Sequence, residues 1–527
     1  MAHLSEIVRS AVSGTEASVI ALLTVVVVVF LTLTAIHRAY IHPLRRVPGP
    51  RLARFTELWR TNRYFQGDWF HDILDLHEKY GPVVRIAPNE VSVVSPYLIK
   101  TVYSHTGGTV KTRWYDTWAA LGGGTKAASE APSFFGATDP NQHSFLRRRV
   151  SATYSMSAIV ALEPKIQSVL DMLWTRLDES AKLGQPVDLS IWASYFTYDV
   201  VGTLCLSEPM GLIYKGKDER DFFSCIHGAF YWIANLGNLP WQSYWIANPV
   251  TGFLAPRLNL RIADYARAFQ RFSIDKILSR MQNRGEGTTN DMLDHFLQMK
   301  TVQGEPAPLL EILAEVGNLL AAGADTTSVA IKAVLGPVLK DPIRYKRLQM
   351  EIDAAREAAG GKSLTYNAVK DLPFLTACVK EGSRIHPSII YQLPRVTPAE
   401  GLNIEGYYTN ASTTVSISPL AQNRCRAIFG EDANEWRPER WIEGEGNTLE
   451  KIRQMDKQLA TFGYGSRTCI GRNLAMFKVF KFVAQLMSRY EVELVDRDAA
   501  WKIRSRWFAE IDNCWIRLKA GSHPSAA

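Results

Sequence analysis

The chain has 527 residues, of which 46% are hydrophobic, and this is enough to build a sizeable core. Its formal net charge is +8, but the basic residues are not interleaved with aromatic residues as in nucleic-acid recognition modules, which excludes that class of partner. The six cysteines stand at positions 205, 225, 378, 425, 469 and 514, without the spacing of a zinc site or a disulfide framework, so a reducing compartment is expected.

The N-terminal segment is predicted to be a membrane anchor. Residues 17–36 carry no charge and, as a helix, span about 30 Å, the thickness of a bilayer core. A cleaved signal peptide would have a shorter apolar region and a small-residue cleavage site, whereas this run ends beside Arg38. Because basic residues follow the run, the rest of the chain is expected in the cytosol. The chain is therefore divided into an anchor with its flank, residues 1–46, and one large domain, residues 47–527.

The domain is expected to be mainly α with a smaller β-rich part. Val47-Pro48-Gly49-Pro50 predicts a stiff elbow after the anchor, because proline lacks an amide donor and cannot continue a helix. Beyond the elbow, β-branched residues between positions 83 and 94 surround the turn pair Pro88-Asn89 and predict strands. Later segments change to the 3.6-residue spacing of helices.

Residues 309–334 are predicted to form one long, buried helix, because their apolar side chains recur at helical spacing. This helix contains Ala322-Gly323-Ala324-Asp325-Thr326-Thr327, whose glycine, acid and threonines are weak helix formers. The missing side chain of Gly323, and threonine hydroxyls that compete for backbone carbonyls, can open a groove wide enough for a diatomic ligand. Asp325 and Thr326 then offer a carboxylate and a hydroxyl for moving protons. The alternative is a kinked core helix without a chemical role.

Cys469 lies in a glycine-punctuated loop, FGYGSRTCIGRNLA, that leads directly into an apolar helical pattern. The glycines let the backbone turn sharply and approach a flat macrocycle. A helix N-terminus favours the thiolate, which is the form of cysteine that ligates iron. Arg467 can pair with an anionic haem propionate. The loop therefore predicts a haem-thiolate site, and the alternative is a buried structural cysteine.

The loop matches the haem-loop pattern of the cytochrome P450 superfamily at every position, and on these residues the chain resembles that family. Together with residues 79–90, the loop is similar to that of filamentous-fungal members such as pisatin demethylase. The resemblance covers residues 48–515 and implies the cytochrome P450 fold behind one transmembrane helix. Asn423 and Lys478 depart from the usual pattern, since a histidine and an acid are frequent at these positions.

The resemblance implies a chemical role for several residues. Cys469 would be the axial ligand of haem b iron, with Phe462 and Arg467 beside the haem. Asp325 and Thr326 would steer protons to iron-bound dioxygen, while the thiolate supplies electron density from the other side.

Further residues would hold the haem and its loop, again by resemblance. Three groups would bind the haem propionates: His143, Arg147 and Arg395. For Arg147 the alternative is a solvated basic helix face, because two more arginines follow it. Glu381, Arg384 and Arg440 would form a buried charge network, in which the loss of one partner is costly.

The implied function is a monooxygenase anchored in the endoplasmic reticulum membrane, with its catalytic domain in the cytosol. Electrons from NADPH would arrive through an NADPH–cytochrome P450 reductase, with cytochrome b5 as a further candidate donor. Basic residues that include Arg147, Lys451 and Lys478 are candidates for docking an acidic reductase, and the alternative is a solvated surface. The same fold can also desaturate, couple or rearrange its substrate. A haem-binding sensor without turnover is disfavoured by the Asp325-Thr326 pair.

The expected substrate is a lipophilic small molecule of fungal secondary metabolism, bound by a monomer. Aromatic residues gather where the family places the roof of its substrate pocket, and they are joined by residues 134–135 and 389–391. These roof candidates are Phe222, Phe223, Phe230, Tyr231, Trp232, Trp241, Tyr244 and Trp245. Equally, such side chains can pack in the core or rest at a membrane interface.

Overall fold

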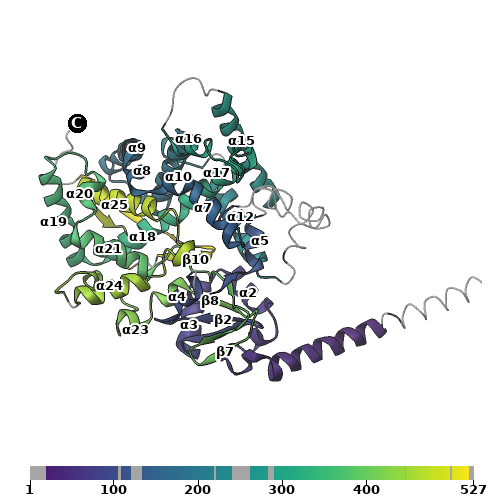
Figure 1. Cartoon of the computed structure of the whole chain (residues 1–527). Coiled ribbons are helices and arrows are strands. Elements are labelled where there is room, and N and C mark those ends of the chain that lie inside the picture. The colour runs from purple at the N-terminus through teal and green to yellow at the C-terminus, as the bar shows by residue number, and fades with distance from the viewer. Residues whose placement is uncertain are drawn as a thin grey trace, which may run out of the picture.

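The computed structural model describes residue 19 and residues 21–104, 108–119, 133–218, 221–239, 242, 262–282, 290–445, 447–498 and 501–520. Helices make up most of this structure, and the sheets are short, as expected for a mainly α protein with a smaller β part (Figure 1). The helices are α2 Leu58–Gln66, α3 Trp69–Tyr80, α4 Leu98–Tyr103, α5 Asp116–Ala119, α7 Pro140–Ser151, α8 Met156–Ala161, α9 Glu163–Lys182, α10 Leu189–Leu206, α11 Leu212–Lys215, α12 Phe222–Leu236, α15 Ile262–Gln282, α16 Met292–Phe296, α17 Leu309–Gly323, α18 Asp325–Lys340, α19 Pro342–Ala358, α20 Tyr366–Val369, α21 Pro373–Ile385, α22 Pro419–Gln422, α23 Arg426–Phe429, α24 Leu449–Gln458 and α25 Arg472–Arg489.

The β part consists of one five-stranded sheet and three smaller sheets. The large sheet has the order β1-β2-β8-β5-β3 and lies at the end of the molecule from which the N-terminal helix projects (Figure 1). The predicted strands around Pro88-Asn89 are its antiparallel pair β1 and β2, buried along their whole length. The strands are β1 Val83–Ala87, β2 Glu90–Val93, β3 Val110–Lys111, β4 Val187–Asp188, β5 Arg395–Val396, β6 Leu402–Ile404, β7 Tyr407–Thr409, β8 Thr414–Ile417, β9 Tyr490–Leu494, β10 Lys502–Arg506, β11 Phe508–Asp512 and β12 Trp515–Ala520.

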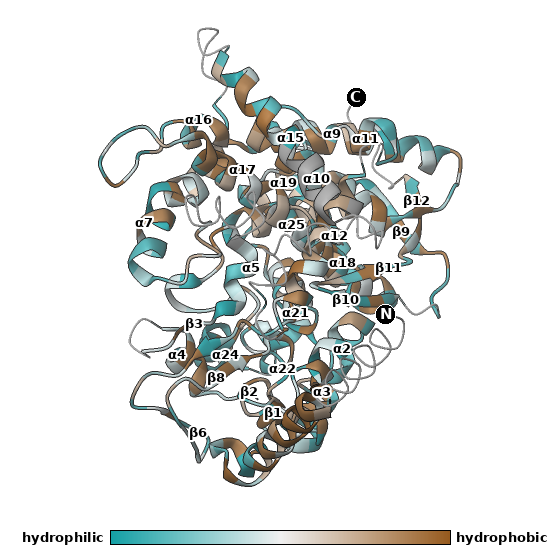
Figure 2. Cartoon of the chain, turned by 90° about the vertical axis from the view of Figure 1, so that its right-hand side faces the viewer, coloured by the Kyte–Doolittle hydropathy of each residue, from teal (hydrophilic) through white to brown (hydrophobic). Residues whose placement is uncertain are grey.

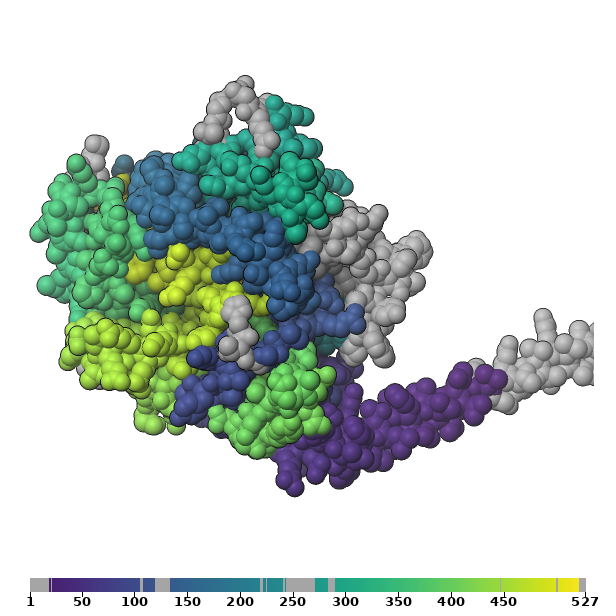
Figure 3. Space-filling model, in the orientation of Figure 1, coloured from purple at the N-terminus to yellow at the C-terminus, as the bar shows by residue number. Residues whose placement is uncertain are grey.

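The N-terminal apolar helix projects away from the folded body (Figures 1 and 3). It is described from Ala21 to Ile41, has a mean hydropathy of 2.1 and is not buried, and it is the brown rod of Figure 2. The first part of the predicted span, before Ala21, lies almost entirely outside the described residues. Arg85 of β1 holds the elbow, because its backbone N–H donates to the Pro48 carbonyl at 2.7 Å. Its guanidinium donates to the carbonyls of Arg38 and Leu44, before the elbow, at 3.3 Å each. The helix is exposed and long enough to cross a bilayer.

The central helix is interrupted, in contrast to the predicted single helix. Residues 309–340 follow one path, but α17 ends at Gly323 and α18 begins at Asp325, with Ala324 between them at φ −92° and ψ −70°. The Oγ1 atoms of Thr326 and Thr327 donate to the carbonyls of Ala322 and Gly323, at 2.8 and 3.1 Å. These hydroxyls satisfy carbonyls that the break leaves free, as expected for threonines in this position. The segment is apolar enough to span a membrane, but it is 72% buried and is a core helix.

The predicted charge network lies in the core, next to the cysteine loop. Glu381, Arg384 and Arg440 are each 0% exposed. Arg384 donates to both carboxylate oxygens of Glu381 at 2.8 Å, and Arg440 Nε donates to Oε1 at 2.9 Å. The third guanidinium nitrogen of Arg384 donates to the Asn423 carbonyl at 2.7 Å. The Asn423 side chain in turn accepts from the backbone N–H of Ala460 at 2.8 Å, so the network is connected to the start of the loop.

Candidate active site

A cavity of about 410 Å³ lies between the interrupted central helix and the cysteine loop. Its volume falls in the range of cavities that bind small ligands, about 300–1,000 Å³. Cys469 and Phe462 line it from the loop, and Gly323 and Thr326 line it from the helix break. The fold thus brings two segments, about 145 residues apart in the chain by their numbers, to one cavity. This is the arrangement that the sequence predicted for a metal ligand and an oxygen groove.

The cysteine loop has the sharp turns that its glycines predicted. Gly463 and Gly465 both have φ of +71°, a conformation that favours glycine. At Gly465 a Cβ atom would overlap the backbone carbonyl of Tyr103, so this residue must also be small. The backbone N–H of Cys469 donates to the Phe462 carbonyl at 2.8 Å and closes the loop. Gly471 has a negative φ, so the prediction that it turns the chain in the same way is wrong.

The Cys469 side chain is exposed although it lies inside the molecule, because it faces the cavity. Burial by the surrounding protein raises the pKa of its thiol, while the backbone N–H groups of Gly471 and Arg472 and the nearby Arg147 act in the opposite direction. The helix N-terminus alone therefore does not make this cysteine a thiolate. A bound metal ion would do so, since coordination deprotonates a thiol.

Cationic side chains line one part of the cavity without acidic partners. The predicted groups His143, Arg147, Arg395 and Arg467 all line it, and Lys111 of β3 joins them. Within the described residues, none of these five groups forms an ion pair with a carboxylate. Burial and the neighbouring positive charges lower the pKa of His143 to about 3 and that of Arg467 to about 10. They also lower the pKa of Lys111 well below its ordinary value.

These features fit a haem. The arginine charges disfavour the protonated forms of His143 and Lys111 unless anions neutralise the set, and two propionates would supply such anions. The apolar remainder of the cavity and the inward-facing Cys469 fit the macrocycle and the fifth iron ligand. Lys111 was not predicted, because a lone lysine in a short strand carries no signal in the sequence. Its place in the set follows only from the pairing of β3 with β5, where Lys111 lies opposite Arg395.

Thr326 and Asp325 point in different directions. Thr326 lines the cavity beside Gly323 and Ala322, as predicted for a hydroxyl at the oxygen groove. Asp325 is 1% exposed and is not part of the cavity lining. Its Oδ2 atom accepts a hydrogen bond of 2.7 Å from the Tyr198 hydroxyl, on the far side of the helix. The two residues are neighbours in the chain, but only the threonine faces the cavity in this conformation.

Lys478 is a core residue, and its prediction as a surface charge for a docking partner is wrong. It is 0% exposed, and its Nζ atom donates to the Gly323 carbonyl at 2.6 Å. Burial lowers the pKa of Lys478 to about 7. Lys478 is a second donor, beside the Thr327 hydroxyl, to the last carbonyl of α17. Lys478 thus stabilises the break from the side of α25.

The predicted roof of the cavity is partly in place. Phe134, Phe135, Phe230 and Ile389 line the cavity, whereas Phe222, Phe223, Tyr231 and Trp232 do not. The candidates Trp241, Tyr244 and Trp245 lie outside the described residues. Several lining residues were not predicted, because they come from segments far apart in the chain: Tyr115, Trp118, Ile226, Leu313, Trp507 and Phe508. Most of these side chains are large and apolar, which suits a lipophilic ligand.

Comparisons with known proteins agree with this geometry. The family described as "Cytochrome P450" matches residues 47–511. Cytochrome P450 monooxygenase cicH from Emericella nidulans is 32% identical over 90% of this chain and 94% of its own length. Cytochrome P450 monooxygenase gsfF from Penicillium aethiopicum is 30% identical over 91% and 94%. Among solved structures, the haem domain of cytochrome P450DA matches with a TM-score of 0.72 and 17% identity, covering 86% of this chain and 93% of that one, which shows the shared fold.

Proposed function

The chain belongs to the cytochrome P450 family, and from the contacts of its cavity we propose that Cys469 would ligate the haem iron and that Thr326 and Asp325 would handle protons for the same cavity. The protein is a haem-thiolate monooxygenase that oxidises small molecules. When bound, the haem supplies the iron at which dioxygen is activated with electrons from a reductase. The remaining steps of the proposal concern this chain's own residues.

Five cationic groups orient the haem in this proposal. Arg147, Arg395 and Arg467 carry fixed charges toward the propionates, and His143 and Lys111 become cationic only when an anion offsets their neighbours. Phe462 covers the thiolate side of the loop together with Arg472, whose guanidinium lies 5.7 Å from its ring centre. The buried Glu381–Arg384 pair keeps the loop in position through Asn423.

Thr326 is proposed to steer protons at the cavity wall by holding the water that carries them. Its hydroxyl already donates to the Ala322 carbonyl, so it can accept a further hydrogen bond from water in the cavity. Asp325 would deliver protons to this point by turning its carboxylate toward the cavity from its present position beside Tyr198. A hydroxyl and a carboxylate in this order suit general acid chemistry.

We propose a lipophilic substrate from fungal secondary metabolism, oxidised at the endoplasmic reticulum membrane. The apolar lining of the cavity supports the substrate class, and the exposed helix Ala21–Ile41 supports a membrane anchor. The relatives compared above come from filamentous fungi. An NADPH–cytochrome P450 reductase, with cytochrome b5 as a second donor, would reduce the monomer from the cytosolic side. Residues 1–46 would serve as the anchor and its flank, and residues 47–527 as the catalytic domain.

The observation that carries the proposal is that Cys469 and Thr326 line the same cavity. Comparative mass spectrometry of metabolites tests it, with cells that make the native chain or Cys469→Ala. The variant should accumulate a precursor with one oxygen atom fewer than the product. A precursor richer by two hydrogens would indicate desaturation or coupling instead. Cys425→Ala is the control, since Cys425 is outside the cavity, and it should leave the product unchanged.

The reduced carbon monoxide spectrum of the purified chain tests the ligand directly. Cys469→Ala should lose the red-shifted band of a thiolate-bound haem, and a retained band would show that another residue is the ligand. For the proton role, Thr326→Ala should divert electrons from product to peroxide. Thr197→Ala is the matched control, because its hydroxyl makes the same bond to a carbonyl four residues earlier in α10, at 3.1 Å, away from the cavity. Equal coupling in the two variants would contradict the role of Thr326.

A further inference from the structure

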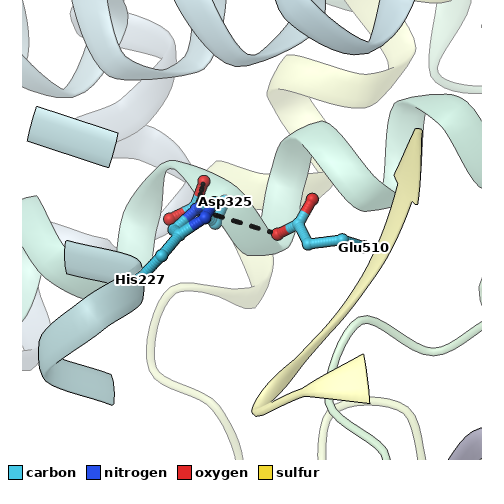
Figure 4. A group of neighbouring side chains, drawn as sticks. All are labelled: His227, Asp325 and Glu510. Carbon is cyan, nitrogen blue, oxygen red and sulfur yellow. Dashed lines mark ion pairs between the residues drawn. The ribbon is translucent and has the colours of Figure 1, made fainter. Parts of the chain in front are cut away.

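Three titratable side chains meet behind the helix break, on the side away from the cavity. His227 comes from α12, Asp325 is the first residue of α18, and Glu510 comes from β11 (Figure 4). The Nε2 atom of His227 lies 2.9 Å from Oδ1 of Asp325 and 3.9 Å from Oε1 of Glu510. The cluster joins a helix from the roof region, the central helix and a strand near the C-terminus.

Asp325 can exchange protons with solvent only through its neighbours in this cluster. The carboxylate is held between two groups, because Oδ2 accepts from Tyr198 at 2.7 Å while Oδ1 faces His227. Asp325 and Tyr198 are 1% exposed each, so neither reaches water. Protons that Asp325 passes to Thr326 must therefore be replaced through one of its neighbours, and the phenol is a poor source because burial raises its pKa well above the ordinary value.

His227 connects the buried carboxylate with an accessible surface. Its side chain is 39% exposed, but Nε2 itself is buried and makes no aligned hydrogen bond within the described residues. The accessible surface therefore belongs to the rest of the side chain. An imidazole can accept a proton at one ring nitrogen and release another proton from the second nitrogen. A rotation of the ring that aligns Nε2–H with Oδ1, 2.9 Å away, would let it give a proton to Asp325 on its buried side and be replenished from its exposed side.

The surrounding charges favour a protonated ring. Two carboxylates face His227, Asp325 and Glu510, and the ammonium of Lys332 lies 3.4 Å from Oε2 of Glu510. Lys332 offsets one carboxylate, so a cationic His227 balances the other. Burial opposes this charge, but Asp325 and Glu510 outweigh it and raise the pKa of His227 to about 9. A divalent cation would compete with Lys332 and with the Tyr198 bond, so the cluster is better suited to hold a proton than a metal ion.

We propose that His227 is the residue through which Asp325 takes up protons from solvent, and that it holds the carboxylate turned away from the cavity between deliveries. This inference rests on the proposed proton role of Asp325 and Thr326. Proton transfer from Nε2 to Oδ1 removes both charges of the ion pair, and the neutral acid is then free to turn toward Thr326. After delivery, the carboxylate returns to the cluster and His227 takes a new proton from water. No electrons move, and each proton taken from water is one delivered to the cavity.

The first test measures the ring itself and does not depend on turnover. Carbon-13 NMR of histidine-labelled full chain, in the diamagnetic reduced carbon monoxide complex, should show one histidine that titrates near pH 9. This signal should be absent in His227→Gln. It should move to lower pH in Asp325→Asn, because the partner charge is lost. A His227 signal that titrates near 6.5, the ordinary value, or that ignores Asp325→Asn, would overturn the proposal.

The second test follows protons during turnover of the full chain with a reductase. Peroxide released per NADPH consumed should rise about tenfold in His227→Gln, which is less than the loss of a positioned general acid because water can substitute in part. In the native chain the peroxide fraction should rise as the pH passes about 9, whereas in His227→Gln it should be high and independent of pH. His295→Gln, the same change in an exposed histidine of α16, is the control and should behave as the native chain.

The two proposals fail in different ways. If Asp325→Asn raises the peroxide fraction and His227→Gln does not, Asp325 acts as proposed and the role of His227 is refuted. If neither variant raises it, the proton role of Asp325 itself is wrong. A rise in His227→Gln without any change in pH dependence would mean that the histidine only supports α12, and this too would overturn the inference.

Discussion

The buried carboxylate of Glu381 offers a quantitative test of how this fold is held together. It accepts hydrogen bonds from both Arg384 nitrogens at 2.8 Å, from the Arg437 backbone N–H at 2.8 Å, from Arg440 Nε at 2.9 Å and from Trp441 Nε1 at 2.9 Å. Burial alone would raise its pKa, but the bonds from Arg384 and the charges of Arg384 and Arg440 hold that pKa below the ordinary value. Glu381→Gln keeps the shape of this side chain and removes its charge.

The expected cost follows from this geometry. The glutamine oxygen can serve the donors on one side, but its NH2 group would face donors on the other side, either Arg384 Nε and Trp441 Nε1 or the Oε1 partners. Each buried donor left without a partner costs about 1–3 kcal/mol. Two guanidinium groups would also lose their buried counter-charge, and breaking such a pair costs about 3–5 kcal/mol. We expect Glu381→Gln to lower the free energy of unfolding by at least about 3 kcal/mol.

A matched control is present in the same molecule. Arg347 and Glu445 form a bidentate pair with both bonds at 2.7 Å, but their side chains are 40% and 37% exposed. Glu445→Gln should cost less than about 1 kcal/mol, because water replaces the lost interaction. Urea unfolding of the full chain in detergent, followed by tryptophan fluorescence, measures both variants, and haem content is determined separately because bound haem adds to apparent stability. Equal losses in the two variants would refute the argument that burial makes the Glu381 network costly to break.

Three further predictions concern the cavity. Burial lowers the pKa of Lys478 to about 7, so between pH 7 and the ordinary lysine pKa the unfolded chain binds more protons than the folded chain. Stability to urea should therefore rise with pH over that window, by up to about 1.4 kcal/mol per pH unit. Lys478→Met should remove this slope, and an unchanged slope would contradict the assignment. Gly465→Ala should abolish haem retention, measured by absorbance, since its Cβ would overlap the Tyr103 carbonyl. Gly463 has the same φ of +71°, but the nearest atom to its Cβ would lie 3.9 Å away, so Gly463→Ala should cost only about 1–2 kcal/mol of strain. Lys111→Met should stabilise the haem-free chain against urea and weaken haem retention, because Arg395 and Arg467 repel the lysine until propionates neutralise the set. If the variant loses both stability and haem retention, Lys111 is only structural.

Local patterns in the sequence were sufficient to predict the conformation of segments that depends only on neighbouring residues in the chain. The turns at Gly463 and Gly465 follow from glycine's freedom at positive φ, and both are present in the loop before Cys469. The weak helix formers after Ala322 predicted a disturbance, and α17 ends within that stretch. The apolar run before Arg38 predicted an anchor-like helix, and the helix Ala21–Ile41 is exposed as expected. Each of these properties is encoded within a few consecutive residues.

Side-chain direction and burial were decided only by the tertiary structure. Asp325 and Thr326 are adjacent in the chain, yet one faces Tyr198 and His227 and the other faces the cavity, because neighbouring residues on a helix point about 100° apart. Lysine is usually a surface residue, but the packing of α25 against the central helix places Lys478 at the Gly323 carbonyl, next to the helix break. Such contacts join residues far apart in the sequence. No local pattern records them, since their free energy depends on which distant groups the fold brings within hydrogen-bonding distance.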